Sequence, residues 1–222
     1  MKITIGKSIT EKLPNFNIIA LSFDCECFDS SEDIDSLIKT TEEKIRGEYS
    51  LEDVLNIPLI KEARDGYKIL KKDPSRYRLA VESLYRRIVK GNSLYRINSL
   101  VDLGNVLSIE TKRSVAALDL DKINGDIYIR LGKDTDVYEG IGRGLINVEN
   151  IPLYEDEIGP FGSTTSDTPR TSITLNTKHL LVFIVCFSKT NINSDKEKAI
   201  MLFTKYGKCK NVIEINVENE LD

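Results

Sequence analysis

The sequence predicts an α+β protein built as one unit, with a helix-rich first half and a strand-rich second half. In residues 31–111, apolar side chains recur at spacings of three and four, the period of helices with one buried face. After residue 114 they come in short runs bounded by turn-forming residues, as in strands. The 222 residues suffice for one substantial core. The length also accommodates two small domains, but we expect one.

The N-terminal segment predicts two strands followed by a helix. Residues 2–5 alternate apolar and polar side chains, and residues 17–23 form a short buried run. We expect these two strands to pair with each other. Asp29-Ser30-Ser31 suits a helix N-terminus, and the helix predicted for residues 31–46 carries isoleucine and leucine on one face.

Three more helices are predicted before the strand-rich half. A turn of helix at residues 50–55 precedes a helix that begins at Pro58, because proline suits the first helical position. A second helix is predicted for Arg76–Val89, and a third begins near Ser99. The first part of the chain should therefore place helices against a small sheet.

The second half predicts mostly strands and one last helix. The glycine-rich residues 140–144 favour a hairpin or loop over a phosphate loop, since they lack the strand–helix context and the Lys-Ser/Thr ending. A helix beginning at Ser194 and a strand at residues 211–217 end the chain. The other predicted strands are residues 115–120, 126–131, 153–155, 172–174 and 180–187.

Composition excludes several classes of protein. Hydrophobic residues make up 41% and charged residues 30%, an ordinary globular balance. The longest apolar run, Leu180–Phe187, is far too short to span a bilayer, and the N-terminus lacks the apolar segment of a signal peptide. We therefore expect a cytoplasmic protein that does not bind membranes.

The charge pattern bears on nucleic acid binding. The net charge of −4 argues against tight, unspecific binding to duplex DNA. Local basic clusters around Arg76, Arg86 and Arg87 nevertheless leave room for guided RNA contact. The commoner interpretation of such clusters is the solvated face of amphipathic helices.

The sequence predicts no metal and no cofactor. The four cysteines form no C-x-x-C pair, and reduced thiols in strands and core fit them better than a zinc site. A Ser-His-Asp triad would depend on His179, the one histidine, which is better explained as an exposed strand end.

A row of polar side chains is the most informative feature of the chain. Asn98, Asp102 and Asn105 are separated by four and three residues, so they lie along one face of a helix. Asp119 and Asp121 alternate into the end of the apolar run that follows. Such a row is more commonly a solvated face. Here we expect Asp102 and Asn105 to face a cleft or cap backbone, and Asp119 to accept backbone N–H groups.

Two motifs carry a family resemblance. The first motif consists of Arg96, Asn98, Val101, Asp102, Asn105, Asp119 and Asp121. The second consists of Arg170, Thr171, Ile173, Thr174 and Thr177. Together they resemble the B3/B4 domain, the tRNA-editing domain in the beta subunit of phenylalanyl-tRNA synthetase, and more closely the free-standing proteins built on that domain alone.

The resemblance implies a domain organisation and a function. A family core over residues 75–188, an unusual β-sandwich with flanking helices, would follow an N-terminal α/β extension at residues 1–74. A C-terminal helix and strand at residues 189–222 would complete a single domain. The implied function is a free-standing editing protein that hydrolyses the ester of a mischarged tRNA in trans. Its partner would be the aminoacyl end of tRNA, and the sequence is also compatible with a homo-oligomer.

The resemblance also implies a site. The pocket should lie between the helix that carries Asn105 and the loop from Gly162 to Asp167. Asn98, Asp102, Asp119 and Arg170 would support it, while Arg76, Arg86 and Arg87 would guide the tRNA. The residues expected to line the pocket are Gly104, Asn105, Ala116, Gly162, Ser163, Thr164 and Phe183.

Three of these positions depart from the synthetases. Gly104 stands where they have threonine, Ala116 where many have histidine, and Phe183 about where they have glutamate. With both ionisable residues replaced, the base for hydrolysis would be a nearby aspartate or the ribose hydroxyl of the tRNA end. The pocket would also accept a different side chain. The alternatives are a non-catalytic binding module for an amino acid or aminoacyl-tRNA, or a partner module of a larger complex.

Overall fold

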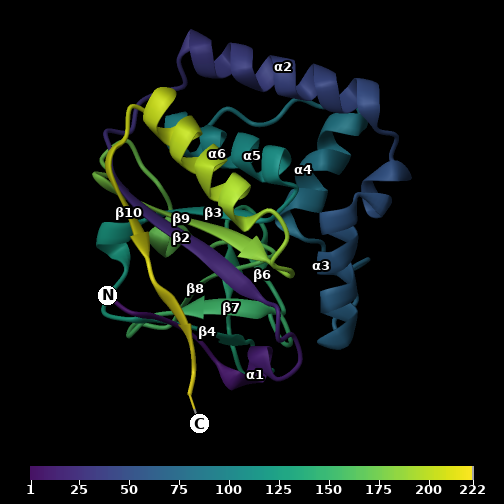
Figure 1. The fold of residues 1–222 in the computed structure, drawn as a ribbon, viewed down its shortest axis with the longest axis vertical. Coiled ribbons are helices and arrows are strands. Elements are labelled where there is room, and N and C mark those ends of the chain that lie inside the picture. The colour runs from purple at the N-terminus through teal and green to yellow at the C-terminus, as the bar shows by residue number, and fades with distance from the viewer. Residues whose placement is uncertain (222) are drawn as a thin grey trace.

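The computed structural model describes residues 1–221 and shows three layers (Figure 1). Helices cover one face of a four-stranded sheet, and the other face of that sheet packs on a five-stranded sheet. This confirms the α+β class and the β-sandwich with flanking helices. No helix in the described part of the chain is both long and apolar enough to cross a membrane.

The four-stranded sheet lies at the centre of the molecule. Its long middle strand, β9 (His179–Cys186), is buried along nearly its whole length, because the sheet is covered on both faces. Every pair of neighbouring strands in this sheet is antiparallel. In spatial order the strands are β10 (Lys210–Ile215), β2 (Asn17–Asp24), β9 (His179–Cys186) and β3 (Val115–Asp119).

The five-stranded sheet forms the outer layer. Its strand β1 (Ile3–Ile5) runs parallel to both neighbours, β11 (Val217–Asn219) and β4 (Ile127–Leu131), whereas the other pairs are antiparallel. Tyr154 of this sheet meets Phe183 of the central sheet edge to face at 5.2 Å, which shows how the two sheets interlock. The strands are β11 (Val217–Asn219), β1 (Ile3–Ile5), β4 (Ile127–Leu131), β7 (Pro152–Glu155) and β8 (Pro160–Ser163).

The helices form the third layer, with α5 at its centre. This helix packs against α2, α4, α6 and strand β3, so it is apolar on nearly every side. The helices are α1 (Lys7–Thr10), α2 (Glu32–Glu48), α3 (Pro58–Ile69), α4 (Ala80–Val89), α5 (Ser99–Thr111) and α6 (Ile192–Lys205). Single 3₁₀ turns are η1 (Asp53–Asn56), η2 (Leu120–Lys122) and η3 (Pro169–Thr171), and β5 (Glu139–Gly140) and β6 (Gly144–Leu145) form the expected hairpin.

Several local expectations were wrong. The first two strands do not pair, because the short helix α1 redirects the chain from one sheet to the other. The helix expected from Arg76 begins at Ala80, after a turn in which the N–H of Tyr77 donates to the Asp73 carbonyl. The chain end is split into β10 and β11, which lie in different sheets.

The strand expected at residues 172–174 is also absent from the described structure. A turn replaces it: the N–H of Thr174 donates to the Thr177 hydroxyl, and the N–H of Thr177 donates to the Thr174 carbonyl. These bonds satisfy the backbone locally, so no neighbouring strand is needed. Strand β8 and helix α1 were not predicted, since proline, glycine and lysine obscure their short apolar patterns.

Candidate functional site

A cavity of about 310 Å³ lies where α5, β3 and the segment at residues 166–173 meet. Most of its wall is aliphatic, with one amide and one carboxyl side chain. The residues that line it are Ile97, Val101, Gly104, Asn105, Val115, Ala117, Ile141, Asp167, Ser172 and Ile173. The structure thus brings Asn105, the last member of the polar row on α5, and Asp167, the last residue of the loop from Gly162, to one cavity.

The first two members of the polar row hold α5 in place. Asn98 caps the helix, and its side-chain oxygen accepts a 3.0 Å hydrogen bond from the N–H of Val101. Asp102 is fully buried and accepts from the N–H of Ile97 at 3.0 Å and from the hydroxyl of Ser30. The prediction that Asp102 caps backbone and avoids bulk solvent is confirmed.

The next turn of α5 faces the cavity. A Cβ on Gly104 would lie only 3.3 Å from the Cβ of Ala117, so glycine lets helix and strand approach closely here. Asn105 is half-buried on the cavity wall. Its amide makes no hydrogen bond to any other residue within residues 1–221, which leaves both its donor and its acceptor atoms available to a ligand.

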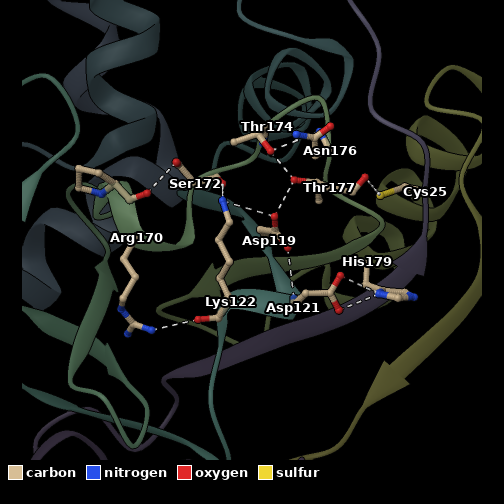
Figure 2. A network of polar contacts seen from close by, with 11 residues as sticks. Cys25, Asp119, Asp121, Lys122, Arg170, Ser172, Thr174, Asn176, Thr177 and His179 are labelled. Atoms are coloured by element: carbon tan, nitrogen blue, oxygen red, sulfur yellow. Dashed lines mark hydrogen bonds and ion pairs between the residues drawn. The ribbon is translucent and has the colours of Figure 1, made fainter.

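The second motif fastens the cavity's loop to the end of β3 (Figure 2). The hydroxyl of Thr177 donates to Oδ2 of Asp119 at 2.8 Å, and Oδ1 of Asp119 accepts from the N–H of Asp121 at 3.2 Å. Asp119 therefore accepts a backbone N–H group, as expected. Lys122 donates to the carbonyl of Ser172 at 2.9 Å and ties the cavity-lining segment to the same strand end.

Arg170 anchors the other side of that loop. Its guanidinium forms a two-pronged pair with Asp156, at 3.0 and 2.8 Å, and also donates to the Lys122 carbonyl at 3.0 Å. Burial raises the pKa of Asp156, but the Arg170 guanidinium and three backbone N–H groups outweigh burial and lower it overall. Arg170 thus joins the start of the second motif to Asp156 and Lys122.

The loop residues expected to bind substrate support the cavity instead of lining it. A Cβ on Gly162 would come within 2.8 Å of Asp167 Oδ1, so only glycine fits beneath that carboxyl group. Ser163 accepts from the N–H of Ser166 at 3.2 Å and donates to its carbonyl at 2.9 Å, which closes the turn. Thr164 is buried and hydrogen-bonds the Tyr67 hydroxyl.

Asp167 is the acidic residue that this turn delivers to the cavity. The residue as a whole is half-buried, but its Oδ1 is fully enclosed and has no hydrogen-bond partner within residues 1–221. Burial raises the pKa of its carboxyl group to about 7. The sequence pointed to a nearby aspartate as base but could not single out this one, because its pKa shift arises from tertiary burial.

Ala116 and Phe183 do not line the cavity, and the expectation that they would was wrong. They face each other across β3 and β9, but both point into the core between the two sheets. Alternate residues of a strand point to opposite faces, so Val115 and Ala117 line the cavity instead. Alternation separates residue 116 from residues 115 and 117, but it does not show which of the two sets faces the helices.

The three arginines expected to guide tRNA lie outside the cavity wall. Arg87 donates to the Ser93 carbonyl at 2.6 Å and stacks on the Tyr95 ring at 3.8 Å. Arg86 lies 4.0 Å from Glu82 on the same helix, and Arg76 precedes the helix.

The other reactive side chains of residues 1–221 lie outside this cavity. His179 is half-exposed and pairs with Asp121 at 2.8 Å, beside the Asp119 network in Figure 2. Within residues 1–221 the four thiols are free, and no three histidine, cysteine or acidic residues are placed to hold a metal ion. A larger hollow of about 520 Å³ beside Cys25 and Lys208 is lined by none of the motif residues.

Comparisons with known proteins find a matching family, a curated relative and a solved structure of the same fold. Residues 62–206 match the family described as the B3/4 domain. The phenylalanine–tRNA ligase beta subunit of Fusobacterium nucleatum is 29% identical over 135 residues, which are 59% of this chain and 16% of that protein. The crystal structure of an N-terminal fragment of the phenylalanyl-tRNA synthetase beta subunit from Pyrococcus horikoshii shares the fold. Its TM-score is 0.54 at 12% identity, over 99% of this chain and 52% of the fragment.

Proposed function

The chain belongs to the B3/4 domain family, and on that premise we propose that it is a free-standing editing protein that hydrolyses the ester of a mischarged tRNA in trans. One observation supports this most. The cavity carries the unpaired amide of Asn105 and the carboxyl group of Asp167 on an otherwise aliphatic wall. An apolar pocket with a few convergent polar groups and a shifted pKa is the usual form of a small-molecule site.

The cavity suits the aminoacyl group in size and polarity. Its volume of about 310 Å³ accommodates an amino acid side chain and the ester, but no more than the end of a tRNA. Because six aliphatic side chains line it, the substrate we propose carries an apolar side chain. A hydroxylated side chain would lose its hydrogen bonds to water there and find few partners in exchange.

Hydrolysis needs an oriented water and support for the developing oxyanion. Asn105 would supply a donor and an acceptor at the wall, and the ribose hydroxyl of the tRNA end would help to position the water. An aminoacyl ester is already activated, so orientation and hydrogen bonding contribute much of the rate. The arginines at positions 76, 86 and 87 would guide the acceptor end from outside the cavity. We expect this reaction in the cytoplasm.

A panel of mischarged tRNAs tests this function. Each is incubated with the protein, and release of the amino acid is compared with the uncatalysed rate. We expect one or a few esters with apolar side chains to be hydrolysed, and Asn105→Ala to lower that rate at least tenfold. Asn92→Ala, which removes an exposed amide beyond the end of α4, is the matched control and should behave as wild type. Equal rates for Asn105→Ala and wild type would reject this site.

A non-catalytic binding module is the second candidate. The aliphatic wall and the lack of a histidine or glutamate among its residues favour it. A partner module of a larger complex is the third. The chain spans only 16% of the curated relative, so the activity of that whole enzyme does not transfer to it. Binding of an aminoacyl-tRNA without any hydrolysis in the panel would support the second candidate.

A further inference from the structure

Among the described residues, Asp167 provides the one carboxyl group that lines the cavity, and its Oδ1 has no hydrogen-bond partner. Asp102, Asp119 and Asp156 each accept at least two hydrogen bonds from protein donors. Asp167, by contrast, has an enclosed Oδ1 without a partner in the described residues, and its side chain lines the cavity. Leaving a buried polar atom unsatisfied costs stability, so such a group in a native protein calls for an explanation in function.

The local structure holds this carboxyl group in place. The carbonyl of Asp167 accepts a 2.9 Å hydrogen bond from the N–H of Ile141, which itself lines the cavity. Gly162 lies directly beneath Oδ1, where any side chain would collide with it. The turn closed by Ser163 and Ser166 precedes it. The side chain is thus set on a rigid loop, which is what a proton-transfer group needs.

We infer that Asp167 is the general base of the proposed hydrolysis, and this inference rests on the proposed function. The oxygen of a water molecule attacks the ester carbonyl carbon while its proton passes to the Asp167 carboxylate. The bond between that carbon and the ribose oxygen then breaks, and the proton passes from Asp167 to the departing ribose oxygen. Amino acid and tRNA are released, and the carboxylate is regenerated.

The electrostatic surroundings are consistent with this role. Burial raises the pKa of Asp167 to about 7, close to the value at which a general base works best at neutral pH. Tyr138 and Tyr154 are the titratable groups whose pKa values respond to its charge, and burial raises both, so they stay neutral around pH 7. Among the described residues, no lysine, arginine or histidine lines the cavity.

The test compares steady-state deacylation by wild type and Asp167→Asn over pH 5.5–8.5, with the uncatalysed rate subtracted at each pH. The substrate is the mischarged tRNA found in the panel. We expect kcat of the variant to fall about 10²- to 10⁴-fold while KM changes little. Wild-type kcat should rise with pH up to about pH 7 and then level off, and the variant should lose this rise. Asp134→Asn, which changes an exposed carboxylate outside the cavity and outside both motifs, is the matched control.

The outcomes separate the two proposals. Hydrolysis by wild type with an unchanged kcat and pH profile in Asp167→Asn would overturn the role of Asp167 and leave the editing function standing. A substrate ending in 2′-deoxyadenosine would then show whether the ribose hydroxyl is the base. No hydrolysis of any ester by wild type would reject the editing function and the base together. If Asp167→Asn does not fold, the wild-type profile decides, and a profile that is flat through pH 7 rejects the base.

Discussion

Thr177 and Asp119 join the two motifs of the chain through a 2.8 Å hydrogen bond between the threonine hydroxyl and Oδ2 of the aspartate. The N–H of Thr174 donates back to the same hydroxyl at 3.0 Å, so Thr177 serves as donor and acceptor at once. All three residues lie outside the cavity wall. The motif residues at this end of β3 therefore hold the loop in place.

Removing that hydroxyl should destabilise the protein. Thr177→Val keeps the shape of the side chain but leaves Asp119 Oδ2 and the N–H of Thr174 without their partner. We expect the free energy of unfolding to fall by roughly 1–3 kcal/mol, measured by urea denaturation. Thr204→Val, which alters an exposed hydroxyl on α6, should change it much less. Equal effects from the two variants would contradict the fastening role.

Asp102 should contribute to the stability of the protein, because it is fully buried and accepts two hydrogen bonds. Asp102→Asn replaces an acceptor oxygen by a donor, which then faces the N–H of Ile97 or the hydroxyl of Ser30. Hydrogen bonds to charged groups contribute roughly 1.5–3 kcal/mol, and we expect a loss of that size in the free energy of unfolding. Asp65→Asn, which changes a half-exposed acid on α3, is the control. A loss below about 0.5 kcal/mol would show that Asp102 does not support α5.

The sequence predicted these supporting residues better than it predicted the cavity wall. Asn98 and Asp102 follow from helix period and capping chemistry, which are local. Ala116 and Phe183 were assigned by position along a family pattern, and that assignment pointed them to the wrong face of the sheet. In a strand buried on both faces the composition is apolar throughout, so hydrophobicity alone does not show which residue faces the helices.

The other features that the sequence did not predict arise from tertiary structure. Asp167 owes its shifted pKa to enclosure by residues distant in sequence, such as Tyr138 and Tyr154. No spacing in the sequence encodes that enclosure. The division of the chain end between two sheets depends likewise on how β2 and β1 lie relative to each other.

Gly104 should control the depth of the cavity. In Gly104→Ala the added methyl group would lie 3.3 Å from the Ala117 Cβ, and one of the two must shift by a few tenths of an ångström. Alanine also favours the helix by about 1 kcal/mol over glycine, so we expect the net change in stability to stay within about 1 kcal/mol. Deacylation of the largest accepted side chain should fall more than that of the smallest, measured as kcat/KM. A uniform effect on all esters would contradict this geometry.

Asp167 should make the protein less stable as the pH rises. Its pKa is about 7 in the folded protein against an ordinary 3.8, so the folded state binds more protons between these values. The stabilisation is complete below pH 3.8 and is lost as the pH rises to about 7. Asp167→Asn does not ionise at this position. Relative to wild type, its free energy of unfolding should therefore increase by up to a few kcal/mol between pH 4 and pH 8. Urea denaturation at several pH values measures it, and a difference that does not change with pH would contradict the raised pKa.

The basic residues outside the cavity should set how binding depends on salt. If Arg76, Arg86 and Arg87 contact tRNA phosphates, Arg76→Gln with Arg87→Gln should weaken binding of uncharged tRNA. The slope of log K against log salt should become shallower by about 1–2, since two fewer counterions are released. Lys2→Gln with Lys12→Gln removes the same charge from exposed positions near the N-terminus and is the matched control. Equal slopes for the two double variants would mean that only net charge matters, and the proposed path for the acceptor end would then be wrong.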